Sequence, residues 1–113
     1  MVVGGNIRCL LKLAGTPYWL DMTDKILLLE ARSGGVAQMT TYLSQLQQMG
    51  VFGQIRGILL GTFTQMEREQ AKPEITELVM RFAGEKMPIA KTSWIGHGAD
   101  SRAIVIGEEI LLN

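Results

Sequence analysis

Two side chains suited to joint acid–base chemistry, Glu30 and His97, each follow an apolar run of strand length. Glu30 directly follows the run 26–29, and His97 stands in a Gly-His-Gly turn after Trp94-Ile95. If both runs are parallel strands that lie next to each other in the sheet, a carboxylate and an imidazole lie within reach of each other at one sheet edge, where open α/β sheets bind ligands. Glu30 would then accept a hydrogen bond from one imidazole N–H, while the other ring nitrogen of His97 would take a proton from a hydroxyl nucleophile.

The nucleophile of such a triad is missing from the pattern. Neither the serines nor the single cysteine stand in a recognisable nucleophile turn. Cys9 falls at an apolar position of a predicted helix, so it is interpreted as a small buried hydrophobic residue. Taken singly, Glu30 also fits the first solvated residue after a strand, and His97 fits an exposed loop side chain. The residues by themselves leave both interpretations open.

The apolar periodicity alternates between helical and strand-like spacing. One helix is expected over 7–14 with Asn6 as its cap, and a second over 36–47. A third is expected to have Pro73 in its first turn. A glycine is expected to end each helix. Strands are expected within residues 25–30, 55–63 and 87–93. A closing hairpin is expected from residues 103–106 and 109–112.

Strands separated by helices of this length indicate right-handed parallel crossovers. The sequence therefore predicts one α/β domain over residues 1–113, with a small parallel or mixed sheet, crossover helices and a C-terminal hairpin. Thr62 and Thr64 are expected just beyond the second strand. Because the first helix begins so near residue 1, a preceding element is expected to be missing, and both ends look cut.

Composition narrows the classes of partner. Acidic and basic residues balance at 11 each, without a Lys/Arg cluster in the sequence, so we expect neither nucleic acid nor a membrane as partner. Near-zero net charge favours self-association, which makes a homodimer plausible. A single cysteine, no recognisable signal peptide and no apolar run of membrane-spanning length indicate the cytoplasm.

The sequence also argues against a bound cofactor or metal. One histidine and one cysteine in separate elements supply too few ligands for zinc. A glycine pair before the first helix lacks the rest of a dinucleotide or P-loop fingerprint. We therefore expect no cofactor and no metal.

Several short motifs, in this order and spacing, resemble one known family. They are Gly4-Gly5-Asn6, Gly15-Thr16-Pro17-Tyr18, Lys25 to Glu30, Leu43-Ser44-Gln45-Leu46, Met49-Gly50-Val51, Gly57 to Phe63, Pro88-Ile89 and Gly96-His97-Gly98. Together they look like the C-terminal domain of the LD-carboxypeptidases, serine peptidases that include the microcin C immunity peptidases. The resemblance covers roughly residues 3 to 110 and implies a swivelling β/β/α-type domain.

The resemblance also implies site residues and partners. Family members carry the serine nucleophile and its oxyanion hole on an N-terminal domain, and the triad glutamate and histidine on the C-terminal domain. Glu30 matches the triad acid and His97 the base. The family hydrolyses an amide next to a D-amino acid, as in murein tetrapeptides, or a microcin-C-like peptidyl nucleotide, without metal or cofactor, and its members are commonly dimers. This chain alone is therefore expected to be inactive.

One departure from the family leaves other functions open. Relatives continue after the triad glutamate with acidic residues, whereas this chain has Ala31-Arg32-Ser33-Gly34-Gly35. The first alternative is a free-standing, non-catalytic binding or dimerisation module that retains the fold. The second is a substrate-binding α/β domain of an unrelated enzyme, which rests on fold class alone.

Overall fold

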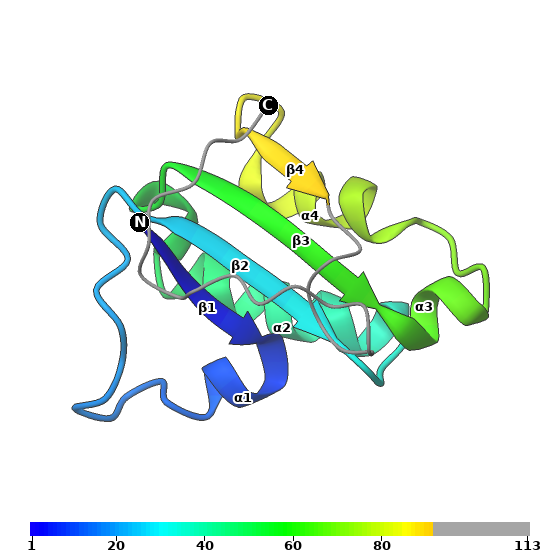
Figure 1. The fold of residues 1–113 in the computed structure, drawn as a ribbon, viewed down its shortest axis with the longest axis horizontal. Coiled ribbons are helices and arrows are strands. Elements are labelled where there is room, and N and C mark those ends of the chain that lie inside the picture. Colours follow the sequence, from blue (N-terminus) through cyan, green and yellow to red (C-terminus); the bar gives the residue numbers. More distant parts are fainter. Residues whose placement is uncertain (92–113) are drawn as a thin grey trace.

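The computed structural model describes residues 1–91, which form a parallel sheet of four strands with helices packed on one face (Figure 1). The elements, in chain order, are β1 (Val2–Asn6), α1 (Ile7–Leu11), β2 (Ile26–Ala31), α2 (Val36–Gln48), the 3₁₀ turn η1 (Val51–Gly53), β3 (Gly57–Phe63), α3 (Thr64–Arg68), α4 (Ile75–Ala83) and β4 (Ile89–Lys91). The predicted α/β class and the parallel pairing are confirmed. The hairpin predicted over 103–106 and 109–112 lies outside the described residues.

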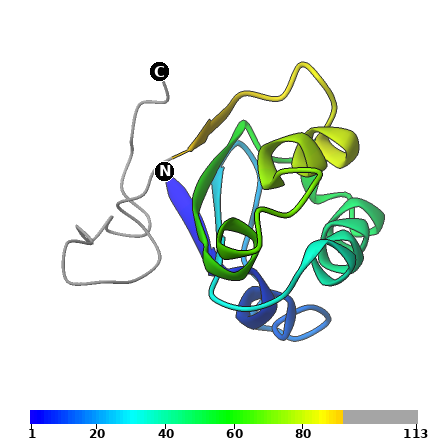
Figure 2. The same cartoon turned by 90° about the vertical axis from the view of Figure 1, so that its right-hand side faces the viewer.

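The strands lie in the sheet in chain order, β1-β2-β3-β4. Right-handed crossovers that step in one direction place their helices on the same face of the sheet. Figure 2 shows α2 and α4 together on one side of the strands, and the two helices contact each other. The main core lies between this face and the helices; it includes Val3, Leu27, Leu29, Ile58 and Leu60 from the strands, Met39, Leu43 and Leu46 from α2, and Ile75, Leu78 and Val79 from α4.

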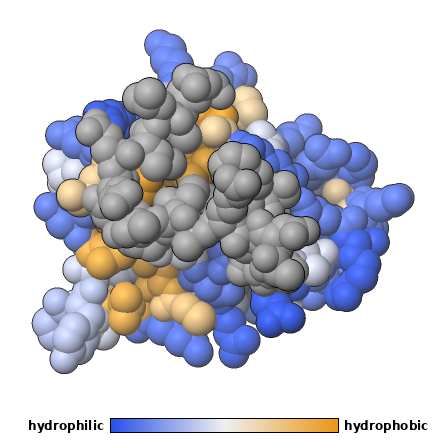
Figure 3. Space-filling model, in the orientation of Figure 1, coloured by the Kyte–Doolittle hydropathy of each residue, from blue (hydrophilic) through white to orange (hydrophobic). Residues whose placement is uncertain are grey.

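The opposite face of the sheet carries a second, smaller apolar cluster. Val2, Ile26, Leu28 and Leu59 are each at most 5% exposed and form this cluster. No helix of residues 1–91 covers this face in Figure 2, and Figure 3 shows hydrophobic surface on it beside the hydrophilic surface around α3. Because side chains alternate along a strand, Glu30 belongs to the same face as Ile26 and Leu28.

The structure differs from the prediction at the N-terminus. A strand that was not predicted, β1, precedes the first helix and pairs in parallel with β2. The strand was not recognised because only Val2 and Val3 are apolar before two glycines. Asn6 ends β1 and caps α1, as predicted, with its Oδ1 accepting a hydrogen bond from the Cys9 N–H at 3.1 Å.

Cys9 is exposed, so its predicted burial is wrong. The buried residues of α1 are Ile7, Leu10 and Leu11. Cys9 lies two residues after Ile7, which places it on the other side of a helix with 3.6 residues per turn. Moreover, α1 ends at Leu11 rather than Ala14.

The remaining boundaries are close to the prediction. Gly50 and Gly84 follow α2 and α4 with positive φ angles of 80° and 96°, as expected for glycines after a helix. Pro73 was predicted in a first helical turn but precedes α4, whose N-cap is Glu74. Thr62 was expected beyond its strand and lies inside β3, because the strand extends to residue 63. The short helix that follows it, α3, was not predicted.

Gly4 on β1 lies in register with Leu28 on β2. Its φ is +114°, and a Cβ there would overlap the carbonyl oxygen of Leu28 and crowd Leu27. A backbone oxygen inside a paired strand cannot turn away as a flexible side chain can. Only glycine therefore fits this strand pairing.

Gly4→Ala is expected to lower the free energy of unfolding by at least about 2 kcal/mol, because it adds both backbone strain and an overlap with β2. Gly53→Ala is the control, since a Cβ there would meet nothing within 4 Å. Urea unfolding of both variants measures the difference. Equal unfolding midpoints for the two would contradict this account of Gly4.

Candidate functional site

The carboxyl ends of the parallel strands bring polar residues to one edge of the sheet. Asn6, at the end of β1, is the register partner of Glu30 on β2. Thr62 and Thr64 stand at the end of β3 and the start of α3. Neighbouring strands lie about 4.8 Å apart. The fold therefore gathers these residues where an open α/β sheet binds ligands.

Glu30 lies opposite an irregularity in the sheet. Leu29 pairs with Leu60, but Ala31 pairs with Phe63, so β3 has one more residue than β2 across this interval. Such bulges interrupt the regular ladder and re-aim side chains, and they occur often next to active sites. Glu30 is half-buried, and its Oε2 atom is shielded from solvent.

The loop after Glu30 is held against α3 by a hydrogen bond between segments distant in the sequence. The Gly34 N–H donates to Gln65 Oε1 at 2.7 Å. Gln65 Nε2 in turn donates to Glu69 Oε2 at 3.3 Å. Gly34 has φ +108°, and a Cβ there would run into Gln38 and Met39. Gln65 was missed by the sequence analysis because it lies 31 residues from its partner, in a helix that was not predicted.

His97 lies outside the described residues, as do Asp100 and Arg102. Its predicted strand is observed as the short β4, which ends at Lys91, six residues before His97. The expected proximity of Glu30 and His97 depended on the assumption that the strands leading to them are neighbours. That assumption is wrong, because β3 lies between β2 and β4. The proximity of Glu30 and His97 stays a prediction.

A small basic pocket adjoins Glu30. It has a volume of about 210 Å³ and is lined by Asn6, Arg8, Cys9, Lys12, Ala31, Arg32 and Ser33. Three of these are cations, and none is an acid. The sequence shows no run of basic residues; the fold assembles the three cations from α1, the residue after it and the loop after β2.

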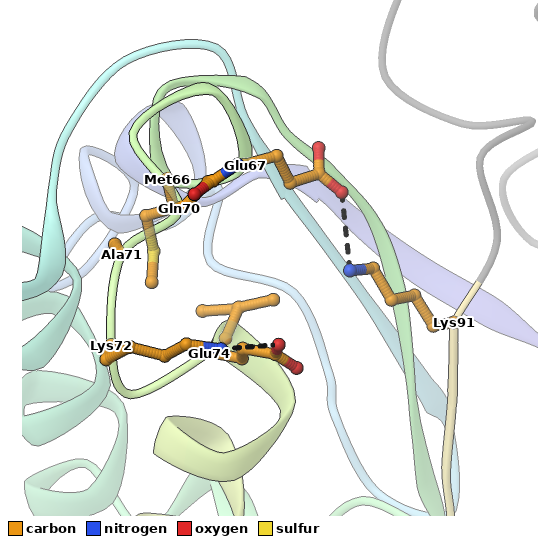
Figure 4. A pocket seen from close by; sticks show the side chains of 8 residues that line it. Met66, Glu67, Gln70, Ala71, Lys72, Glu74 and Lys91 are labelled. Atoms are coloured by element: carbon orange, nitrogen blue, oxygen red, sulfur yellow. Dashed lines mark hydrogen bonds and ion pairs between the residues drawn. The ribbon is translucent and has the colours of Figure 1, made fainter.

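A larger hollow of about 440 Å³ lies between α3, α4 and the end of β4 (Figure 4). Two ion pairs border it: Glu67 Oε1 lies 3.3 Å from Lys91 Nζ, and Lys72 Nζ lies 3.0 Å from Glu74 Oε1. Met66 and Ile75, both buried, also line it. Because the charges on this rim balance, the hollow has no preference for an ion of either sign.

Within residues 1–91, no group of three or more His, Cys, Asp or Glu side chains is arranged to hold a metal ion. The same residues contain no helix with the length and apolar character needed to cross a membrane.

Comparison with known proteins identifies the family. Residues 1–112 match the LD-carboxypeptidase C-terminal domain. The chain belongs to the LD-carboxypeptidase family. A Bacillus subtilis (strain 168) protein described as a probable murein peptide carboxypeptidase is 29% identical over 117 residues, which cover 99% of this chain and 36% of that protein.

Solved structures show the same fold. The microcin C7 self immunity protein MccF aligns with a TM-score of 0.67 at 22% identity, over 80% of this chain and 28% of MccF. A muramoyltetrapeptide carboxypeptidase from Oxalobacter formigenes aligns with a TM-score of 0.63 at 21% identity, over 81% of this chain and 33% of that structure. This chain thus spans about a third of the length of these LD-carboxypeptidase relatives.

At the rim of the larger hollow, the hydrogen bond and charge of Lys72 lower the pKa of Glu74 from its ordinary value of 4.5. Lys72→Met is therefore expected to raise the pKa of Glu74 towards 4.5. A carboxyl with a depressed pKa in the folded state stabilises the fold above its unfolded pKa and loses this contribution as the pH falls through the folded pKa. The wild-type chain should lose slightly more stability below pH 4.5 than the variant.

NMR titration of the Glu74 carboxyl in both proteins measures this shift. An unchanged Glu74 titration curve in Lys72→Met would show that the lysine is not the cause.

Proposed function

We propose that this domain supplies the glutamate and histidine of a Ser-Glu-His triad in an LD-carboxypeptidase-like hydrolase. The observation that carries the proposal is the position of Glu30. It is the residue that matches the triad acid, and it lies half-buried at the bulged carboxyl edge of a parallel sheet in a domain of this family. His97 is the general base, and Glu30 accepts a hydrogen bond from its imidazole.

The strand geometry supports this pairing. Two strand spacings separate β4 from β2, which amounts to about 10 Å. The six residues from Lys91 to His97 reach up to about 20 Å when extended. The chain after β4 is therefore long enough to return His97 across β3 to Glu30.

The triad assigns a separate task to each group. The base takes the proton from a serine hydroxyl as the hydroxyl attacks the scissile carbonyl, and it then protonates the leaving amine. The acid holds the imidazole in the required tautomer and stabilises the imidazolium that forms. A carboxylate shielded at one oxygen and fixed on a strand paired on both sides suits this orienting task.

The nucleophile is proposed to come from an N-terminal domain of the same protein, which is consistent with relatives about three times as long as this chain. The proposed reaction is amide hydrolysis of a murein tetrapeptide or of a microcin-C-like peptidyl nucleotide. The relatives named for a murein peptide and for microcin C7 immunity support these two substrate classes. A cytoplasmic homodimer that acts without metal or cofactor completes the proposal.

In the complete hydrolase, Glu30→Gln and His97→Ala are each expected to reduce kcat by several orders of magnitude, because triad members act as a unit. Glu85→Gln is the matched control, since Glu85 is an exposed carboxylate in the segment between α4 and the start of β4, at the opposite edge of the sheet. Steady-state release of the C-terminal D-amino acid measures the loss. Near-full activity of either triad variant would refute the assignment.

The 113-residue chain alone is expected not to hydrolyse the peptide and not to react with a fluorophosphonate probe, because it lacks the activated serine. Mass spectrometry of the chain after incubation with the probe tests this expectation. A serine adduct, or turnover by the chain itself, would show that the nucleophile lies within these residues.

A non-catalytic binding or dimerisation module is the second candidate. The loop Ala31-Arg32-Ser33, which departs from the acidic pattern of the family, favours it. The triad variants distinguish the two candidates, because a module has no turnover for Glu30→Gln to abolish.

A further inference from the structure

We propose that the basic pocket beside Glu30 binds the C-terminal carboxylate of a peptide substrate through Arg8, Lys12 and Arg32. This inference rests on the proposed carboxypeptidase function and adds the group that such an enzyme must recognise. It assigns a binding role to residues outside the triad.

The pocket begins at the two residues that flank Glu30. Asn6 is the register partner of Glu30, and Ala31 follows it in the chain; both line the pocket. Both backbone separations, across the sheet and along the strand, are about 4 to 5 Å. The pocket therefore adjoins the end of the strand that carries Glu30.

A carboxypeptidase needs positive charge close to its catalytic groups. Its substrate ends one residue beyond the scissile amide, so a negative carboxylate lies about 4 Å, one Cα spacing, from the bond that breaks. A site that recognises this end must offer positive charge next to the catalytic groups. The lining residues of the pocket provide that charge without including an acid.

The three cations are not neutralised by acids within residues 1–91. The ion pairs observed there are one between Lys25 and Asp21 and the two at the larger hollow. None of them involves Arg8, Lys12 or Arg32. The contrast with the larger hollow is informative, because each lysine there has its own glutamate. The pocket therefore holds a net positive charge that an anion can neutralise.

The size and donor types of the pocket favour a small planar anion. Its volume of about 210 Å³ lies below the range of roughly 300–1,000 Å³ that is usual for drug-sized ligands. Guanidinium groups such as those of Arg8 and Arg32 donate paired hydrogen bonds to carboxylates, and the Ser33 hydroxyl adds a neutral donor. All three cations are exposed, so the binding should be weak and should weaken further with salt.

The test is titration of the 113-residue chain with N-acetyl-D-alanine, followed by the backbone amide shifts of Arg8, Cys9 and Ser33 in NMR. N-acetyl-D-alanine amide is the neutral probe of the same shape. The carboxylate is expected to shift these amides with saturation, and the amide probe is expected to leave them unchanged. Arg32→Gln and Arg8→Gln should each weaken binding by about fivefold.

Arg81→Gln is the matched control, because Arg81 is an exposed arginine on α4 outside the pocket, and this variant should bind as the wild type does. Equal shifts with the neutral probe, or unchanged affinity in both pocket variants, would overturn the proposal. Inorganic phosphate that binds more tightly than the carboxylate, with the same dependence on Arg32, would overturn the assignment to a carboxylate.

These binding measurements use chains in which Glu30 is unchanged, so their outcome does not depend on whether the triad assignment is correct. Loss of turnover in Glu30→Gln without carboxylate binding would refute only the pocket. Carboxylate binding with full activity of Glu30→Gln would refute only the triad.

Discussion

The pairing of β2 on both sides determines where the candidate chemistry lies. β2 pairs in parallel with β1 and with β3, so its backbone is held on both sides from Ile26 to Leu29. The parallel direction brings all strand ends to one edge, and the pairing with β1 places Asn6 next to Glu30. A residue at the end of a central strand is more firmly positioned than one on a loop, because the strand that carries it is paired on both sides.

The same pairing divides β2 between two environments. Leu27 and Leu29 face the helices, whereas Leu28 belongs to the cluster on the opposite face, together with the position of Glu30. A shift of one residue in the pairing would exchange these sets and bury the carboxylate against the helices. The apolar contacts of both faces therefore fix the register, and the register fixes the face on which Glu30 lies. Gly4 allows this pairing because it adds no side chain where β1 meets Leu28.

Local patterns in the sequence predicted the elements that carry a strong local signal. The apolar runs of β2 and β3, the Asn6 cap and the helix ends at Gly50 and Gly84 each depend on a few neighbouring residues. β1 was missed because two valines before two glycines make too short a run. The burial of Cys9 was predicted wrongly because its polarity does not reveal the side of α1 on which it lies.

Contacts between distant segments could not be predicted in this way. The strand order, the bulge opposite Glu30, the Gly34–Gln65 hydrogen bond and the grouping of Arg8 with Arg32 all depend on how separate elements pack. The sequence named Glu30 through its position after an apolar run and through the family motif. It gave no local signal for the pocket beside it, because the cations of that pocket are dispersed along the chain.

The hydrogen bond from Gly34 to Gln65 connects the surroundings of two cavities at this edge of the sheet. Gln65 lies on α3, and the same five-residue helix carries Met66 and Glu67, which line the larger hollow. The hydrogen bond therefore joins the loop that follows Glu30 to the helix that borders the larger hollow, so both cavities are built on a shared support.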